Sequence, residues 1–313
     1  RKVTAPTEAT LQQRIGNTET TPERNTSYDE IWQASGALSD PSAPNNIKVL
    51  VLQRNCVSPA ELDDILTKSF LEDNRKVDFV ILPEGAHHEG GQATLEANQH
   101  LRQLAKIIGK HSVWACLGTM GETILPPTCS SSTTPTPRPT HHHCTALIVG
   151  PTGELCCTYR KRATMGITQT PGTEPCVFQT EFGLVGVLIC YDAEHPQYVQ
   201  ETLDLNPILI LNPVHISAGA LRTTSERNMR NHAWRTSMES MGRHVDRIVS
   251  KRAEQGKSLS WIRCDMPYPI GAGTSQITEP CRTQHVPTYA TTNWTTLVQI
   301  QRESAVTVDE LDE

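Results

Sequence analysis

Three side chains that can carry out nucleophilic chemistry each follow an apolar run of the sequence. Glu84 comes after "VILP", Lys161 after "CCTYR" and Cys190 after "GVLI". Polar groups at the carboxyl ends of buried strands are a frequent location of active sites in α/β proteins. A thiol can attack a carbonyl carbon, a carboxylate can take up and return the proton, and an ammonium can stabilise the oxyanion. The three residues together therefore predict nucleophilic acyl chemistry.

Each of the three residues has a simpler interpretation when it is taken alone. Cys190 can be a small apolar thiol that packs in a buried strand. Glu84 can be a carboxylate that faces water at a strand end, and Lys161 can belong to a solvated basic face with Arg160 and Arg162. Only the combination of the three favours a catalytic site.

The apolar pattern predicts strands that alternate with helices. The segment 47–55 is typical of a buried strand, and 58–73 of an amphipathic helix that Ser58 caps and Pro59 begins. The other expected elements are strands at 77–84, 112–119, 183–190, 207–213, 258–264, 274–278 and 295–303, helices at 94–111, 196–204 and 224–241, and a two-stranded hairpin at 144–161. Such alternation indicates an α/β fold with some antiparallel pairing.

Three short motifs resemble the signatures of a known enzyme family. They are "LPE" (82–84), "YRK" (159–161) and "ICYD" (189–192), in that order and each after an expected strand. They are similar to the three signatures of the nitrilase superfamily of carbon-nitrogen hydrolases. Supporting matches are "LNPVHISAG" (211–219), "HAWRTSMES" (232–240) and "GAGTSQITEP" (271–280). The resemblance covers residues 47 to about 302.

The resemblance implies a four-layer α-β-β-α sandwich that pairs face to face into a homodimer or higher oligomer. It also implies that Cys190 is the nucleophile that forms an acyl-thioester, with Glu84 as base and Lys161 as stabiliser. The backbone N–H of Tyr191 would bind the oxyanion, and His215 lies in the segment that lines the family's site. The expected reaction is hydrolysis of a non-peptide carbon-nitrogen bond in a small-molecule amide or carbamoyl substrate, without a cofactor.

The sequence departs from the family pattern beside the expected pocket. Gln169 stands where many members have a second glutamate, and an amide can form hydrogen bonds but cannot act as a base. Glu174 is close enough in sequence to substitute for it. The residues after the nucleophile, 194–197, also differ. An alternative hypothesis is therefore a nitrilase-like pseudoenzyme that serves as a structural or interaction subunit, and a third is acyl transfer from the same thioester to an amine or alcohol.

A metal site is not expected. His87, His88 and Glu89 are candidate ligands, but adjacent side chains in an extended segment point to opposite sides, and no third cluster has matching spacing.

The whole-chain composition restricts the classes of partner. The polar segment 1–46 is expected to be an extended arm that can contact a larger complex, 47–302 a single hydrolase domain, and 303–313 an acidic tail. A net charge of -6 with scattered basic residues gives no reason to expect nucleic acid, and no apolar run is long enough to span a membrane. The ten cysteines form no C-x-x-C pair. Two sequons, at Asn25 and Asn293, allow secretion, but we expect a cytoplasmic or organellar protein.

Overall fold

The computed structural model describes residues 46–54, 57–73, 77–87, 93–124, 142–164, 169–215, 243–265, 276–279, 282–285 and 294–301. The expected arm at 1–46 lies almost wholly outside these residues, and the acidic tail at 303–313 lies outside them entirely. Within the described part, no helix has the length and apolar character that a membrane crossing needs.

Two six-stranded mixed sheets form the centre of the described structure. In sheet A the order is β12 (Trp294–Gln301), β1 (Asn46–Gln53), β2 (Phe79–Ile81), β3 (Trp114–Thr123), β4 (His142–Val149) and β5 (Leu155–Arg160). In sheet B it is β11 (Arg282–His285), β10 (Gln276–Glu279), β9 (Ser260–Asp265), β8 (Leu209–Val214), β7 (Gly183–Val187) and β6 (Cys176–Thr180).

Each sheet has three parallel strands at its centre and antiparallel strands at its flanks. The parallel sets are β1, β2 and β3 in sheet A and β7, β8 and β9 in sheet B. β4, β5 and β12 add to sheet A in antiparallel pairing, as β6, β10 and β11 do in sheet B. The chain crosses from one sheet to the other between β5 and β6. It returns to sheet A at β12.

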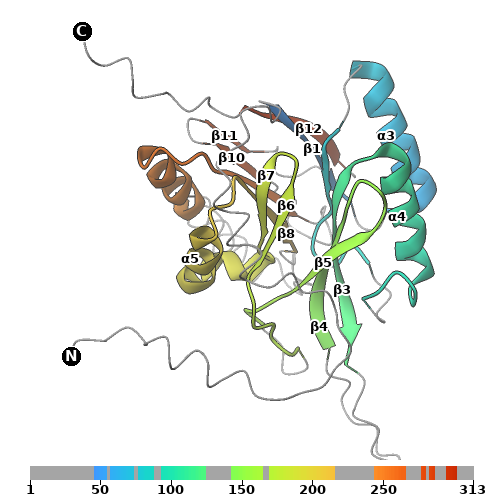
Figure 1. Cartoon of the computed structure of the whole chain (residues 1–313), viewed down its shortest axis with the longest axis horizontal. Helices are drawn as coiled ribbons and strands as arrows, with labels where there is room; N and C mark the ends of the chain where they lie inside the picture. The colour runs from blue at the N-terminus through green and yellow to red at the C-terminus, as the bar shows by residue number, and fades with distance from the viewer. Residues whose placement is uncertain are drawn as a thin grey trace, which may run out of the picture.

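Helices cover the outer face of each sheet. Helices α3 (Pro59–Asp73) and α4 (Gln99–His111) lie beyond sheet A, and α5 (Pro196–Asp204) and a helix at 243–254 lie on the opposite side (Figure 1). The predicted four-layer α-β-β-α sandwich is confirmed.

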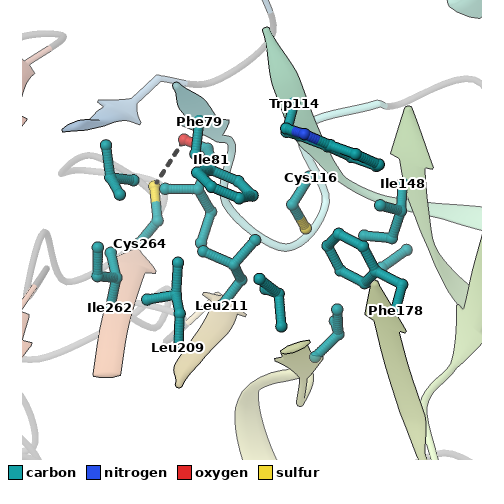
Figure 2. Close-up of a cluster of buried hydrophobic side chains, with 14 of the residues drawn as sticks. Phe79, Ile81, Trp114, Cys116, Ile148, Phe178, Leu209, Leu211, Ile262 and Cys264 are labelled. Carbon is teal, nitrogen blue, oxygen red and sulfur yellow. Dashed lines mark hydrogen bonds between the residues drawn. The ribbon is translucent and has the colours of Figure 1, made fainter. Parts of the chain in front are cut away.

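Alternation of side chains along the strands builds the layers. In β1, Val49 and Val51 enter the core between the sheets, whereas Leu50 and Leu52 pack on the helix side. Both faces of the central strands are buried, which is why their sequences are almost continuously apolar. In the core between the sheets, Phe79 and Ile81 of β2 face side chains from β8 and β9 (Figure 2), among them Leu209, Leu211 and Ile262.

Local chemistry explains where the predicted helices begin. The backbone N–H of Glu61 donates to the Ser58 hydroxyl, as the predicted cap requires. The second helix begins at Gln99 instead of 94, because the Asn98 side chain accepts from the Leu101 N–H and caps it there. The prediction for α5 is confirmed at both ends.

One further expectation needs correction, and another falls on residues that the structure does not describe. Strand β7 ends at Val187, three residues before Cys190, because side chains replace the neighbouring strand as partners: Asn212 donates to the Leu188 carbonyl and Asp192 accepts from the Ile189 N–H. Cys190 then begins a 3-10 helix, η1 (Cys190–Glu194). The expected helix at 224–241 lies outside the described residues. The helix at 243–254 was not predicted, although Val245, Ile248 and Val249 have helical spacing and pack on sheet B.

Candidate active site

The predicted site residues lie where strands of both sheets end. Glu84 follows β2 and Lys161 follows β5 in sheet A. Cys190 follows β7 and His215 follows β8 in sheet B. The Glu84 N–H donates to the Val214 carbonyl over 3.2 Å, so a backbone hydrogen bond joins the two sheets at this point.

Glu84 is the centre of the site. Its Oε1 accepts from Lys161 Nζ at 2.6 Å and from the Cys144 thiol at 3.5 Å. Its Oε2 accepts from the backbone N–H of His215 at 3.1 Å. The side chains of Lys161 and Glu84 are 7% and 12% exposed, so water screens this ion pair only weakly. The carboxylate therefore has a fixed orientation with a partner on each oxygen.

Cys190 lies beside the same carboxylate in an unusual backbone conformation. Its φ is 45°, in the left-handed region that few residues with a side chain adopt. Its thiol contacts the backbone carbonyl of His215 at 4.0 Å. Glu84 and Lys161 are both close enough to shift the pKa of this thiol. Residues in this region of backbone space cluster at functional sites. The structure thus brings Glu84, Lys161 and Cys190 together.

The surroundings hold Cys190 in the thiol form. Burial, and then the negative charge of Glu84, raise the pKa of Cys190 to about 12, although Lys161 acts in the opposite direction. Burial by itself would lower the pKa of Lys161, but Glu84, Cys190 and Cys144 raise it above its ordinary value. The resting site therefore has a neutral thiol next to an ammonium-carboxylate pair.

A second cysteine, which was not among the predicted site residues, also touches the base. Cys144 belongs to β4, and its thiol lies 3.4 Å from the Thr119 hydroxyl as well as 3.5 Å from Glu84 Oε1. Burial, with the charge of Glu84, raises the pKa of the Cys144 thiol. The neutral S–H is therefore a donor to Glu84. Only the register of β3 and β4 reveals this contact.

Asp192 ties the lysine segment to the nucleophile segment. Its carboxylate is fully buried and accepts from four donors: the Tyr159 hydroxyl at 2.8 Å and the backbone N–H groups of Arg162, Ala163 and Ile189 at 3.1, 2.6 and 3.1 Å. Burial raises the pKa of Asp192, while the donors act in the opposite direction. Three of the donors flank Lys161 and one precedes Cys190. Asp192 is part of the "ICYD" motif, but the sequence assigned it no role.

The remaining predicted residues have contacts of different kinds. His215 reaches Glu84 and Cys190 through its main chain. The Tyr191 ring packs edge-on against His195, with ring centroids 4.8 Å apart, and only its N–H was predicted to bind an oxyanion. Gln169 lies next to His142 at the start of β4. Substrate contacts of Gln169, Tyr191 and His215 stay predictions.

Among the described residues, no group of three or more His, Cys, Asp or Glu side chains is arranged to hold a metal ion. His88 and Glu89 lie outside the described part of the chain. The His87 ring is buried, and its Nε2 lies 2.5 Å from the Leu117 carbonyl.

Comparison with known proteins identifies the family of this chain. The family model for carbon-nitrogen hydrolases matches residues 65–244. The chain therefore belongs to the carbon-nitrogen hydrolase family, within the nitrilase superfamily. No curated protein sequence matches it significantly.

Several solved structures share this fold at low sequence identity. Saccharomyces cerevisiae Nit3, a member of branch 10 of the nitrilase superfamily, has a TM-score of 0.61 and 16% identity over 85% of this chain and 94% of its own. A carbon-nitrogen hydrolase from Helicobacter pylori G27 has a TM-score of 0.58 and 14% identity over 83% and 90%. A mutant amidase from Nesterenkonia sp. AN1 has a TM-score of 0.55 and 15% identity over 85% and 93%.

Proposed function

We propose that this protein hydrolyses a non-peptide amide or carbamoyl carbon-nitrogen bond through an acyl-thioester on Cys190. The observation that carries the proposal is the position of the Glu84 carboxylate. It is ion-paired with Lys161 at 2.6 Å, bound to the backbone of His215, and close enough to Cys190 to raise its pKa. A nucleophile, a base and a cation within one site are the groups that acyl transfer requires.

The first half of the reaction begins from the neutral thiol. As Cys190 Sγ attacks the substrate carbonyl carbon, its proton passes to Glu84, so no free thiolate has to form beforehand. The carbonyl oxygen gains negative charge, which the Lys161 ammonium and the Tyr191 N–H stabilise. Glu84 then gives the proton to the leaving nitrogen, the carbon-nitrogen bond breaks, and the amine or ammonia departs.

In the second half of the reaction, water replaces the thiol as the nucleophile and Glu84 again takes up and returns the proton. Glu84 takes a proton from a water molecule, which attacks the thioester carbon. The carbon-sulfur bond breaks, the proton returns to Sγ, and a carboxylic acid is released (a carbamic acid from a carbamoyl group). The orientation of Glu84 serves both halves, because its two oxygens are held by partners from different sheets.

An amide is the substrate class that the comparisons favour. The Nesterenkonia amidase carries the acetamide moiety of fluoroacetamide as a covalent addition at its active-site cysteine. The same family and fold in this chain support an amide-type substrate here.

The test is turnover of a panel of small aliphatic amides and N-carbamoyl compounds by the full chain, with ammonia or amine release as the readout. We expect C190A to lose all measurable turnover and to keep the circular dichroism spectrum of the wild type. C156A removes a partly exposed thiol of β5 that contacts Glu154 instead of the site, and it is the matched control. Its activity should stay within about twofold of wild type, because single changes away from the site have small effects. Full activity in C190A would remove the proposal.

A further inference from the structure

A second pair of thiols lies away from the candidate active site. The Sγ atoms of Cys157 and Cys176 are 3.6 Å apart, which is van der Waals contact. Cys157 belongs to β5 and Cys176 to β6, and these strands end the strand orders of sheet A and sheet B respectively. Both side chains border the core between the two sheets. The pair therefore joins the two edge strands between which the chain passes from sheet A to sheet B.

The geometry is close to that of a disulfide. A disulfide has an S–S distance of about 2.05 Å, so the two sulfur atoms have to approach by roughly 1.5 Å. Among the described strands, β5 pairs only with β4 and β6 only with β7, so both are edge strands that can adjust more easily than central ones. Cys157 is partly exposed, so a small oxidant can reach it.

We propose that Cys157 and Cys176 are a modification site at which a peroxide forms an intramolecular disulfide between the two sheets. The thiolate of one cysteine attacks the peroxide, forms a sulfenic acid and releases water. The second thiol then attacks the sulfenic acid sulfur, the S–S bond forms, and a second water leaves. Two thiols lose two protons and two electrons, and one hydrogen peroxide is reduced to two waters.

The cross-link closes the chain segment 157–176, which contains Lys161. Because Lys161 follows β5 directly, the disulfide restrains the strand that positions this residue and fixes β5 to the opposite sheet. The inference does not depend on the proposed hydrolase activity, since the cross-link is detected by mass.

The neighbouring thiols define the competing products. Cys156 precedes Cys157 and borders the same core, but its thiol contacts the Glu154 side chain at 3.4 Å. Cys116 is fully buried in the same core, and burial raises its pKa to about 12. The hydrogen bond with Cys176 and burial also raise the pKa of Cys157. Formation of the disulfide is therefore expected to accelerate from pH 7 to pH 8.5.

The experiment exposes the folded full chain to hydrogen peroxide, blocks free thiols with iodoacetamide and digests without reduction. Trypsin and Glu-C together release 155–160, "LCCTYR", and a fragment that ends at Glu181 and contains Cys176 but not Cys190. Random pairing of Cys176 with the nine other cysteines would link it to the peptide 155–160, which carries Cys156 and Cys157, in roughly two ninths of the Cys176 cross-links. We expect at least about threefold more than this share in the folded protein.

Variants identify the partners. The linked peptide persists in C156A, which is the matched control, and disappears in C157A and C176A. The cross-linked wild type should also unfold about 5 °C higher than the reduced form, because the closed segment is restrained in the unfolded chain. A Cys176 that stays alkylated after peroxide, a cross-link that survives in C157A, or an unchanged or lower Tm of the cross-linked protein would each contradict the proposal.

Discussion

The two oxygens of the Glu84 carboxylate have separate partners. Oε1 faces Lys161 and Cys144 of sheet A, and Oε2 faces the backbone of His215 after a strand of sheet B. A base that is held on both oxygens loses little orientational freedom when substrate binds. The same contacts make the position of Glu84 sensitive to any shift between the two sheets.

Asp192 provides a prediction at the scale of a single residue. In D192N, an amide NH₂ replaces one carboxylate oxygen. An NH₂ group cannot accept a hydrogen bond, so the backbone N–H or hydroxyl donors on that side lose their acceptor. We expect the free energy of unfolding to fall by about 2 kcal/mol or more, since buried donors lose a charged acceptor. Urea denaturation of the full chain measures this loss.

The control for D192N is Y159F, which removes one of the four donors and leaves the backbone contacts in place. Its expected loss is about 1 kcal/mol. Equal stability of D192N and wild type would show that Asp192 does not hold the two segments together.

At the scale of an element, β3 contains an irregularity that positions Glu84. Its pairing with β4 shifts register between Cys116 and Thr119, and Gly118 in this shift has a φ of +73°. A Cβ on Gly118 would lie 2.2 Å from the backbone oxygen of Pro83, the residue before Glu84. Only glycine permits this close approach at this φ.

G118A is therefore expected to displace the turn that carries Glu84. The free energy of unfolding should fall by at least about 2 kcal/mol, from the left-handed φ and the overlap together. G121A on the same strand is the matched control, because its Cβ would meet only a His142 side-chain carbon at 3.8 Å. Thermal unfolding of both variants checks this prediction, and a G118A protein as stable as G121A would contradict it.

The sequence predicted the elements that have a clear apolar period. α5 and the hairpin of β4 and β5 were predicted correctly because a proline, a turn and an apolar pattern mark their ends. The start of α4 was wrong by five residues, since 94–98 continues the polar pattern and only the Asn98 contact decides the cap. The helix at 243–254 had an apolar pattern that was overlooked.

For the site, the residue types and the family motifs predicted Glu84, Lys161 and Cys190. Sequence could not predict that Cys144 touches Glu84, because this contact depends on which residues of β3 and β4 face each other. Nor could it predict the four donors around Asp192, which come from two segments brought together only by the packing of the sheets.

At the scale of the whole molecule, one core joins the two sheets. Leu211 is fully buried in this core. In L211A, lost burial and the cavity should lower the free energy of unfolding by about 3 kcal/mol. Because both sheets share the core, far-UV circular dichroism and tryptophan fluorescence should report one common transition. L205A, at a partly exposed site after α5, makes the same change and should cost less than half as much. Separate transitions for the two probes would contradict a shared core.

Assembly also belongs to this scale. The resemblance to the nitrilase superfamily predicts that copies of the chain pair face to face. Sedimentation equilibrium should therefore give at least twice the chain mass of 34.6 kDa. A mass equal to one chain at micromolar concentration would contradict this prediction.

The most direct test of the central claim measures the pKa of Cys190. The rate of its carbamidomethylation by iodoacetamide, followed by mass spectrometry against pH, reports the thiolate fraction. Burial, and then the charge of Glu84, raise the pKa of Cys190 to about 12, and Lys161 acts against them. E84Q should therefore shift the pH profile of labelling down by at least about one unit and speed labelling at pH 8, while K161M should slow labelling.

E84Q should label faster and yet lose amide turnover, because this variant forms thiolate more readily but cannot return a proton to the leaving nitrogen. Unchanged labelling profiles in both variants would show that Glu84 and Lys161 do not act on Cys190, and the account of the site would be wrong.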